Sequence, residues 1–217
     1  MNPGLKRSES EAGGVSDDDT DHGHAHEDHH THNNEHDHHA HDDEHDHGHS
    51  GDHDHHAHDL DTLGYAVVTV SSSRGYEDDP AGDAIESAVE ADGDEVVVRE
   101  IVVDDFDGVQ EAVDRLVDRD DADCVVTTGG TGVTPDDVTV EAVSQLFEKE
   151  LPGFGELFRS LSRAEIGTTV VGTRATAGIV GEVPVFCLPG SENAARLGSE
   201  EIIVEEAAHL AGLARRE

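Results

Sequence analysis

Basic side chains and long apolar runs are scarce in this sequence of 217 residues. It holds 13 lysines and arginines against 51 acidic residues, which gives a formal net charge of −38. Because nucleic-acid binding depends on basic contacts to phosphate, this composition argues against a nucleic-acid partner. No stretch approaches the roughly 18 apolar residues of a transmembrane helix, and the N-terminus lacks the apolar core of a secretory signal. We therefore expect a cytoplasmic protein with no membrane partner.

Cysteine is also rare, with only Cys124 and Cys187 present. Each lies within an apolar strand pattern, so we expect buried thiols in a reducing compartment. Neither has an evident histidine partner, which argues against a catalytic cysteine.

The acidic excess extends over the whole chain. Residues 1–59 hold 17 acidic and two basic residues, and residues 60–217 hold 34 and 11. Such a surface is typical of a halophilic protein from a salt-rich cytoplasm, where screening shortens the reach of charge repulsion to about 3 Å at 1 M salt and carboxylates stay hydrated. The alternative is an ordinary acidic protein from a low-salt cell.

Residues 1–59 contain almost no large apolar side chain, which predicts a disordered tail. Seventeen of the 18 histidines fall between His22 and His58, interleaved with acids. Imidazole is the commonest metal ligand, so the tail is predicted to bind several weak, exchangeable Zn²⁺, Ni²⁺ or Cu²⁺ ions. The alternative is a solvated polar linker. Candidate ligands are His29, His30, His38, His39, His55 and His56.

Residues 60–217 carry the pattern of a folded domain. Strands are predicted at about 65–70, 95–103, 124–126, 168–171 and 183–188, and helices at about 80–91, 107–119, 137–148, 153–163 and 200–213. This alternation predicts an α/β three-layer sandwich, with a mostly parallel sheet and helices on both faces. Ligands in such sheets bind beyond the carboxyl ends of the strands.

A glycine-rich run, T-T-G-G-T-G at residues 127–132, follows the third strand and precedes a predicted helix. Three glycines in four residues let the backbone approach a ligand closely. Backbone N–H groups at a helix N-terminus bind anions. Asp137, near the predicted helix start, is placed either to hold a hydrated divalent cation or to cap the helix.

Three further motifs follow the glycine run: L-P-G-F-G-E-L-F-R at residues 151–159, T-R-A-T-A-G at 173–178 and L-P-G-S at 188–191. In this order and spacing the motifs resemble the MogA/MoaB family of molybdenum cofactor biosynthesis proteins, which have the molybdopterin-binding fold. The resemblance covers roughly residues 63 to 213. Its most specific part is T-T-G-G-T-G…D-x-T together with P-G-F-G-E.

The resemblance implies a site for molybdopterin and Mg·ATP. Asp137, two residues before Thr139, matches the family's catalytic and Mg²⁺-binding position, while Asp136 beside it does not. The substrate-binding candidates are Ser71, Ser72, Thr128, Gly129, Gly130, Thr131, Gly132, Gly153, Gly155, Glu156, Arg174, Pro189, Gly190 and Ser191. Alternatives stay open for several of them: Glu156 as a first-turn helix acid, Arg174 and Arg159 as partners of local acids, and Pro189–Ser191 as a plain turn.

Two positions depart from the family pattern. Ser72 replaces a common aspartate, which puts any carboxylate role of this loop in doubt, although hydroxyls still suit phosphate. Ala81 stands where a serine is frequent, so that hydroxyl contact is absent.

The activity implied by the resemblance is transfer of AMP from Mg·ATP to the phosphate of molybdopterin. It also implies a molybdenum-insertion protein of the same pathway as partner, and a homo-oligomer, either a trimer or a hexamer. The alternatives are a non-catalytic molybdopterin binder or carrier, and a metal storage or delivery protein that acts through the tail. Molybdenum and tungsten remain equally open.

Overall fold

The computed structural model describes residues 62–73 and 78–216. The predicted tail of residues 1–59 and its histidines lie outside the described residues. The strands are β1 (Gly64–Val70), β2 (Glu95–Val102), β3 (Cys124–Thr128), β4 (Lys149–Glu150), β5 (Thr176–Val180) and β6 (Val183–Leu188). The helices are α1 (Pro80–Asp92), α2 (Phe106–Val117), α3 (Thr139–Ser144), α4 (Pro152–Ile166), the 3-10 helix η1 (Gly167–Gly172), α5 (Glu192–Gly198), the π-helical turn η2 (Ser199–Ile203) and α6 (Val204–Ala214).

The described strands form one sheet in the order β2-β1-β3-β6-β5-β4. β1 pairs in parallel with β2 and β3, and β3 pairs in parallel with β6. β5 runs antiparallel to both β6 and β4. The sheet is therefore mostly parallel, as predicted. The carboxyl ends of the four parallel strands β2, β1, β3 and β6 all lie at the same end of the sheet.

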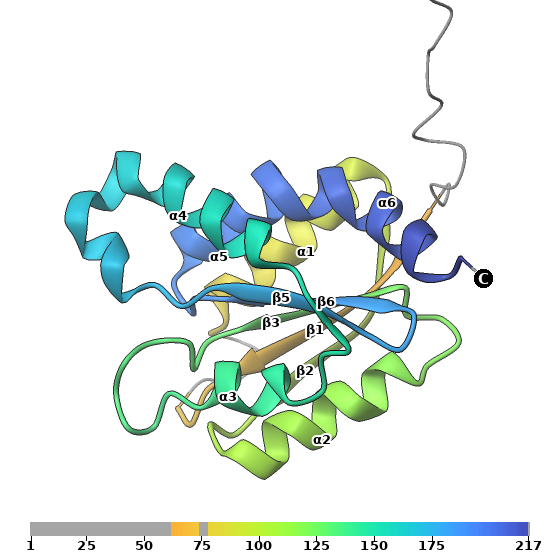
Figure 1. The fold of residues 1–217 in the computed structure, drawn as a ribbon, viewed down its shortest axis with the longest axis horizontal. Coiled ribbons are helices and arrows are strands. Elements are labelled where there is room, and N and C mark those ends of the chain that lie inside the picture. Colours follow the sequence, from red (N-terminus) through yellow and green to blue (C-terminus); the bar gives the residue numbers. More distant parts are fainter. Residues whose placement is uncertain (1–61, 74–77, 217) are drawn as a thin grey trace, which may run out of the picture. The chain divides into compact units, whose positions relative to one another are not determined.

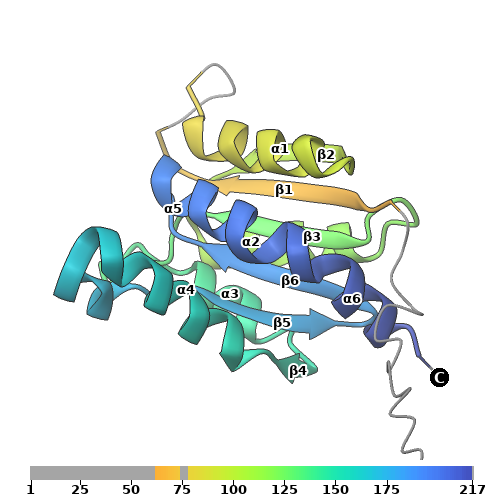
Figure 2. The same cartoon turned by 90° about the horizontal axis from the view of Figure 1, so that it is seen from above.

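Helices cover both faces of the sheet, which makes the three-layer sandwich (Figure 1). One face packs on α1, α4, α5, η2 and α6, and its core includes Tyr65, Phe158 and Phe186. The other face packs on α2 and α3, and its core includes Val68, Val113 and Val185. Residues that alternate along β1 point to opposite faces because the side-chain period of a strand is two. Figure 2 shows α6, α5 and α4 lying across the strands on the first face.

Aspartates fix the starts of the two N-terminal helices. Asp79 is the N-cap of α1 and accepts a hydrogen bond from the Gly82 amide at 3.1 Å, and Pro80 supplies the preset first helical residue. Asp105 caps α2 in the same way, through the Gly108 amide at 2.9 Å. These caps account for the close agreement between the predicted and observed starts of α1 and α2.

The prediction of a strand at 168–171 was wrong, because these residues lie in the 3-10 helix η1. Their valines do not alternate between two buried faces, and Val171 is 86% exposed. Beyond β6, the sheet continues with β5 and the two-residue β4, and neither of these strands was predicted. The last helix begins earlier than predicted, since α5, η2 and α6 follow one another from Glu192 to Ala214.

Within the described residues, no helix has the length and apolar character needed to cross a membrane.

Candidate functional site

The parallel strands bring three of the predicted segments to the same end of the sheet, where their carboxyl ends lie. The glycine run follows β3, the Pro189–Ser191 turn follows β6, and Ser71 and Ser72 follow β1. A cleft of about 340 Å³ lies at this edge. Its lining residues are Gly129, Gly130, Thr131, Gly132, Asp137, Gly172, Thr173, Pro189 and Gly190. Seven of these were predicted, and Gly172 and Thr173 were not.

Glycine is required at the first two positions of the loop. Gly129 has φ 105° and its amide donates to the Leu188 carbonyl at 3.0 Å, so it sits between the ends of β1 and β6. A Cβ there would overlap the Val70 carbonyl oxygen. Gly130 has φ 61°, and a Cβ there would overlap Thr139 Oγ1. The Gly129 amide is bonded to Leu188, and the Gly132 and Thr134 amides are bonded to Asp137, so the amides that suit a phosphate here are those of Gly130 and Thr131.

The sequence predicted that the glycine loop leads directly into the N-terminus of a helix. In the structure it does not. α3 begins only at Thr139 and has six residues, and its N-cap position is Val138. Pro135 and the bonds of Asp137 hold an irregular turn between the loop and the helix. The Thr139 amide donates to the Gly130 carbonyl at 3.0 Å, which ties the helix start back to the loop. Asp137 therefore does not cap α3.

The Asp137 carboxylate closes this turn from within. Its Oδ2 accepts hydrogen bonds from the Thr134 amide at 2.8 Å and the Thr134 hydroxyl at 2.7 Å. These bonds, with smaller contributions from the Gly132 amide and the Arg174 charge, hold the pKa of Asp137 below its ordinary value. Asp137 is therefore an ionised carboxylate that lines the cleft.

Arg174 fastens the loop from the other side. Its Nε donates to the Thr131 carbonyl at 3.3 Å and its Nη2 to the Asp137 carbonyl at 3.1 Å. Both Nη atoms also bond the Glu141 carboxylate, and this ion pair lowers the pKa of Glu141. Most of the guanidinium donors are thus used within the chain. Arg174, a candidate either for binding an anion or for pairing with local acids, pairs with the local acid Glu141 and holds the two ends of the turn.

Asp104, which the sequence analysis does not single out, lies beside the glycine loop. It follows β2, and its Oδ1 would lie 2.8 Å from a Cβ on Gly130, so it reaches the glycine loop. Burial, and then the charges of Asp137 and Asp136, raise its pKa above the ordinary value. Asp104 Oδ1 and Thr139 Oγ1 are buried without a hydrogen-bond partner among the described residues. The usable signal was its place at the carboxyl end of a parallel strand.

These oxygens fit a magnesium ion. Mg²⁺ takes oxygen ligands, usually one or two protein carboxylates completed by phosphate and water. Asp104 and Asp137 supply two carboxylates at the glycine loop. Burial, and then repulsion from Asp137 and Asp136, raise the pKa of Asp104, and a bound cation would offset both effects. No group of three or more His, Cys, Asp or Glu side chains with metal-site geometry occurs in the described part of the chain, so a cage of protein ligands is absent there.

Comparison with known proteins identifies the family. Residues 66–209 match the family model described as "Probable molybdopterin binding domain". This chain belongs to that family. It is 43% identical over 145 residues to the molybdenum cofactor biosynthesis protein B of Bacillus cereus, which covers 66% of this chain and 86% of the relative. The corresponding protein of Escherichia coli strain K12 is 40% identical over 141 residues, covering 65% and 83%.

Solved structures agree. A crystal structure of molybdenum cofactor biosynthesis protein B matches with a TM-score of 0.70 and 40% identity, covering 72% of this chain and 98% of that one. The tungsten cofactor synthesizing protein MoaB of Pyrococcus furiosus matches with a TM-score of 0.65 and 43% identity, covering 72% and 99%. The MogA/MoaB resemblance is thereby confirmed.

Three other predicted residues, Thr128, Ser191 and Ser71, make hydrogen bonds within the chain. Thr128 Oγ1 donates to the Pro189 carbonyl at 3.0 Å, which joins the two loops. Ser191 caps α5 by accepting from the Ala194 amide at 3.3 Å. Ser71 Oγ accepts from the Ser73 amide at 3.3 Å, and Ser72 is exposed.

The P-G-F-G-E motif of the family lies apart from the cleft in this chain. It starts α4, where Gly153 lines a separate groove beside α6. A Cβ on Gly155 would lie 2.6 Å from the Ala175 carbonyl oxygen, so this glycine allows α4 to pack on the segment before β5. Glu156 is exposed and is the fifth residue of α4, beyond its first turn. The described chain does not bring these three residues to the glycine loop.

Proposed function

We propose that this chain acts in molybdenum cofactor biosynthesis, where it binds molybdopterin and adenylylates it with Mg·ATP. Family membership supports molybdopterin as the ligand. The observation that carries the catalytic part is the pair of carboxylates, Asp104 and Asp137, at a glycine loop suited to phosphate. A binding protein for one phosphate monoester does not need this pair, whereas a site for a nucleotide triphosphate and its metal does.

The reaction transfers an adenylyl group. An oxygen of the molybdopterin phosphate forms a bond to the α-phosphorus of ATP, and the bond to the oxygen that bridges to the β-phosphorus breaks. The electron pair of that bond leaves with pyrophosphate. Such transfers depend mainly on alignment and on electrostatic stabilisation of the phosphates.

The chain supplies both requirements. The amides of Gly130 and Thr131 hold phosphate oxygens, and Arg174 keeps the loop in place through the Thr131 and Asp137 carbonyls. Asp104 and Asp137 would hold Mg²⁺, which when bound spreads the negative charge of the phosphates. Because the chain has a net charge of −38, binding two anionic substrates depends strongly on that cation.

Pyrophosphate release tests this proposal. The purified full chain should release pyrophosphate only when ATP, Mg²⁺ and molybdopterin are all present. Asp137→Ala should lower the rate by about 100-fold or more, since a lost metal ligand leaves phosphate charge uncompensated. The neighbouring Asp136→Ala, an exposed acid outside the cleft lining, is the matched control and should keep most of the rate. Binding of molybdopterin without any pyrophosphate would leave a carrier function instead.

A second candidate function rests on the sequence of the tail. Seventeen histidines among acids between His22 and His58 suit metal storage or delivery, with Zn²⁺, Ni²⁺ or Cu²⁺ as cargo. The two functions are compatible in one chain. We also propose a homo-oligomer, either a trimer or a hexamer, and a molybdenum-insertion protein as the recipient of the product. Sedimentation of the full chain measures the first, and co-purification measures the second.

A further inference from the structure

Asp137 lies on a stretch of chain without regular secondary structure. Residues 129–138 connect β3 to α3 and contain no helix or strand. The backbone of a helix or strand largely sets the direction of its side chains, whereas a side chain on an irregular turn depends on its hydrogen bonds. The direction of the Asp137 carboxylate is therefore set by the groups that bond it.

Thr134 makes three hydrogen bonds with Asp137. The Asp137 amide donates to the Thr134 carbonyl at 3.1 Å, which closes a β-turn with Pro135 at its second position. In return, Asp137 Oδ2 accepts from the Thr134 amide at 2.8 Å and from the Thr134 hydroxyl at 2.7 Å. Any residue at this position can form the two bonds of its backbone groups, so only the hydroxyl bond requires threonine.

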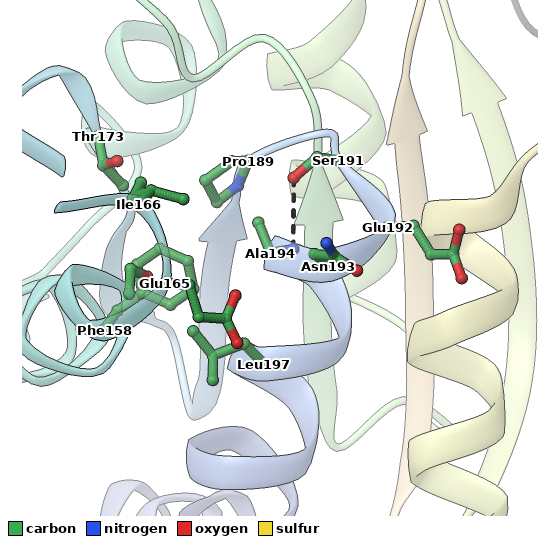
Figure 3. Close-up of a pocket in the computed structure, with 11 residues that line it drawn as sticks. Phe158, Glu165, Ile166, Thr173, Pro189, Ser191, Glu192, Asn193, Ala194 and Leu197 are labelled. Atoms are coloured by element: carbon green, nitrogen blue, oxygen red, sulfur yellow. Dashed lines mark hydrogen bonds between the residues drawn. The ribbon is translucent and has the colours of Figure 1, made fainter. Parts of the chain in front are cut away.

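The Thr134 hydroxyl does little for the stability of the domain. Thr134 is exposed, so the loss of its hydroxyl leaves no cavity in the core. It caps no helix either, because the N-cap position of α3 is Val138. The Ser191 hydroxyl is a contrast, since it accepts from the Ala194 amide at 3.3 Å and caps α5 (Figure 3). Among the described residues, the Thr134 hydroxyl bonds only the Asp137 carboxylate.

The two bonds to Oδ2 also decide which oxygen of Asp137 is left for a cation. A carboxylate oxygen has two lone pairs, and Thr134 occupies both of those on Oδ2. The capacity for a metal ion therefore lies mainly on Oδ1. Asp137 lines the glycine-loop cleft, so a carboxylate fixed in this way meets a cation there with its direction already set.

We infer that Thr134 is a positioning residue of the metal site: its hydroxyl holds the Asp137 carboxylate in the orientation that binds Mg²⁺. This role rests on the proposed function, in which Asp137 and Asp104 hold the metal. Groups that orient metal ligands are worth about 10- to 100-fold in metal affinity or activity. Thr134 is not among the residues that line the cleft, so it acts through Asp137.

The opposite effect is the alternative. A hydroxyl that donates to a carboxylate draws on the same negative charge as a cation, and its removal would then strengthen metal binding. The geometry favours positioning over competition. Thr134 bonds Oδ2 and leaves Oδ1, so the hydroxyl and the metal do not compete for one lone pair.

Three variants separate the hydroxyl from the rest of the side chain. Thr134→Val keeps the β-branched shape but lacks the hydroxyl, and valine suits the extended backbone that is favoured before Pro135. Thr134→Ser keeps the hydroxyl and lacks the methyl group. Thr168→Val makes the same change at an exposed threonine of η1, outside the cleft lining.

Titration of the full chain with Mn²⁺, followed by electron paramagnetic resonance, measures metal binding without turnover. Mn²⁺ suits the same carboxylate and water ligands as Mg²⁺. Asp137→Ala gives the background from the other acids and the histidines, which is subtracted from each curve. Thr134→Val should then bind Mn²⁺ about 10-fold more weakly than wild type. Thr134→Ser and Thr168→Val should bind it as wild type does.

Turnover gives a second readout. At an Mg²⁺ concentration that half-saturates wild type, the apparent kcat of Thr134→Val for pyrophosphate release should fall by about 10-fold, and more Mg²⁺ should recover part of it. The KM for molybdopterin should change little, because the loop amides proposed to hold its phosphate are unchanged. Thr134→Ser should restore the rate. Equal melting temperatures of the variants would show that the fold is unaffected.

Several results would overturn this role of Thr134. They are an unchanged or tighter binding of Mn²⁺ by Thr134→Val, a failure of Thr134→Ser to restore the affinity, and equal binding by wild type and Asp137→Ala, since Asp137 then holds no metal. A lower melting temperature of Thr134→Val with unchanged affinity would leave the hydroxyl a structural part of the turn.

The metal titration needs no turnover, so its result is separate from that of the proposed function. Mn²⁺ affinity that falls in Thr134→Val, in a chain whose wild type releases no pyrophosphate, would uphold the role of Thr134 at the metal and remove the transferase activity. Pyrophosphate release at equal rates, with equal Mn²⁺ affinity, in wild type and Thr134→Val would do the reverse.

Discussion

Asp79 and Asp104 both lie where parallel strands end, yet their surroundings are opposite. Asp79 is 1% exposed and accepts hydrogen bonds from Thr69 Oγ1 at 2.7 Å and from Arg99 Nη2 at 2.9 Å. These partners, Arg99 first, lower its pKa although burial alone would raise it. Asp104 has burial and like charges around it, and its pKa is raised. Both oxygens of the buried Asp79 carboxylate accept hydrogen bonds, whereas Oδ1 of the half-buried Asp104 has no partner among the described residues.

The difference separates a structural carboxylate, Asp79, from the carboxylate that we propose as a metal ligand, Asp104. The Asp79–Arg99 pair joins the end of β1, the start of α1 and the middle of β2, and Arg99 also bonds Asp83 and Glu86. Asp104 makes the folded state less stable than it would otherwise be, which is common where a site awaits a charged ligand. Four measurements test this difference between Asp79 and Asp104 and the acidic character of the chain.

The largest expected effect is on folding stability. Asp79→Ala should cost about 3–5 kcal/mol in the free energy of unfolding, because it breaks the ion pair between a fully buried carboxylate and Arg99 and also removes the N-cap of α1. Asp104→Ala, the matched change, should cost less than about 1 kcal/mol, because it also removes repulsion. Urea unfolding at pH 7 measures both. Equal losses for the two variants would show that Asp104 is as structural as Asp79.

The stability of these two variants should depend on pH in opposite ways, because the pKa of Asp79 is lowered and that of Asp104 is raised. A lowered pKa means that Asp79 stabilises the fold above its ordinary value of 3.8, and that this is lost as the pH falls below it. A raised pKa means that the cost of ionising Asp104 appears as the pH rises above 3.8. The difference in the free energy of unfolding between Asp79→Ala and wild type should therefore become smaller in acid. Asp104→Ala should match wild type in stability at the same low pH.

The second prediction concerns turnover. Asp104→Asn should lower Mg·ATP-dependent pyrophosphate release by about 100-fold, since a metal ligand is lost, and should leave the melting temperature at or above that of wild type. Asp105→Asn, which makes the same change in charge at the adjacent residue and retains a good helix cap, is the control and should change neither the rate nor the stability by much. A rate near wild type in folded Asp104→Asn would remove Asp104 from the site.

The third prediction uses salt. Self-repulsion among the 34 acids of residues 60–217 should make the melting temperature rise from low salt to molar KCl, because screening shortens the range of that repulsion. In Asp104→Asn the rise should be slightly smaller, while the buried Asp79–Arg99 pair should contribute little to it. A melting temperature that does not change with salt would contradict the halophilic interpretation of the composition.

The smallest effect on the domain is expected from the tail. A peptide of residues 1–59 should bind several Zn²⁺ or Ni²⁺ ions weakly at pH 7.5, and much less at pH 5, because imidazoles with an ordinary pKa of about 6.5 become protonated. Calorimetric titration at the two pH values measures this. No heat at pH 7.5, or equal heat at pH 5, would leave the tail as a linker whose acids have no bound cation.

Local pattern was enough to predict most of the fold. The central strands are buried apolar runs, and Asp79-Pro80 and Asp105 mark helix starts by cap chemistry. The errors are at the far edge of the sheet. β4 has two residues, too few for any pattern, and Val170–Val171 resemble a strand but lie in a 3-10 helix.

The site was predicted where it is continuous in sequence and missed where it is assembled in space. The glycine run and Asp137 lie within eleven residues of chain, so a motif finds them. Asp104 lies beside the glycine loop only because β2 ends there. Arg174 donates hydrogen bonds to backbone carbonyls that lie 37 and 43 residues earlier in the chain. Neither contact has a signal in local sequence.

Cys124 and Cys187 point to opposite faces of the sheet from neighbouring strands, and both are fully buried. Burial raises the pKa of Cys124 well above its ordinary value and that of Cys187 to about 12. Molybdopterin, the proposed substrate, carries two thiolates on adjacent carbons, and thiolates readily undergo disulfide exchange. Because neither protein sulfur is accessible or ionised, the substrate would meet no sulfur nucleophile or mixed-disulfide partner from the described part of this chain.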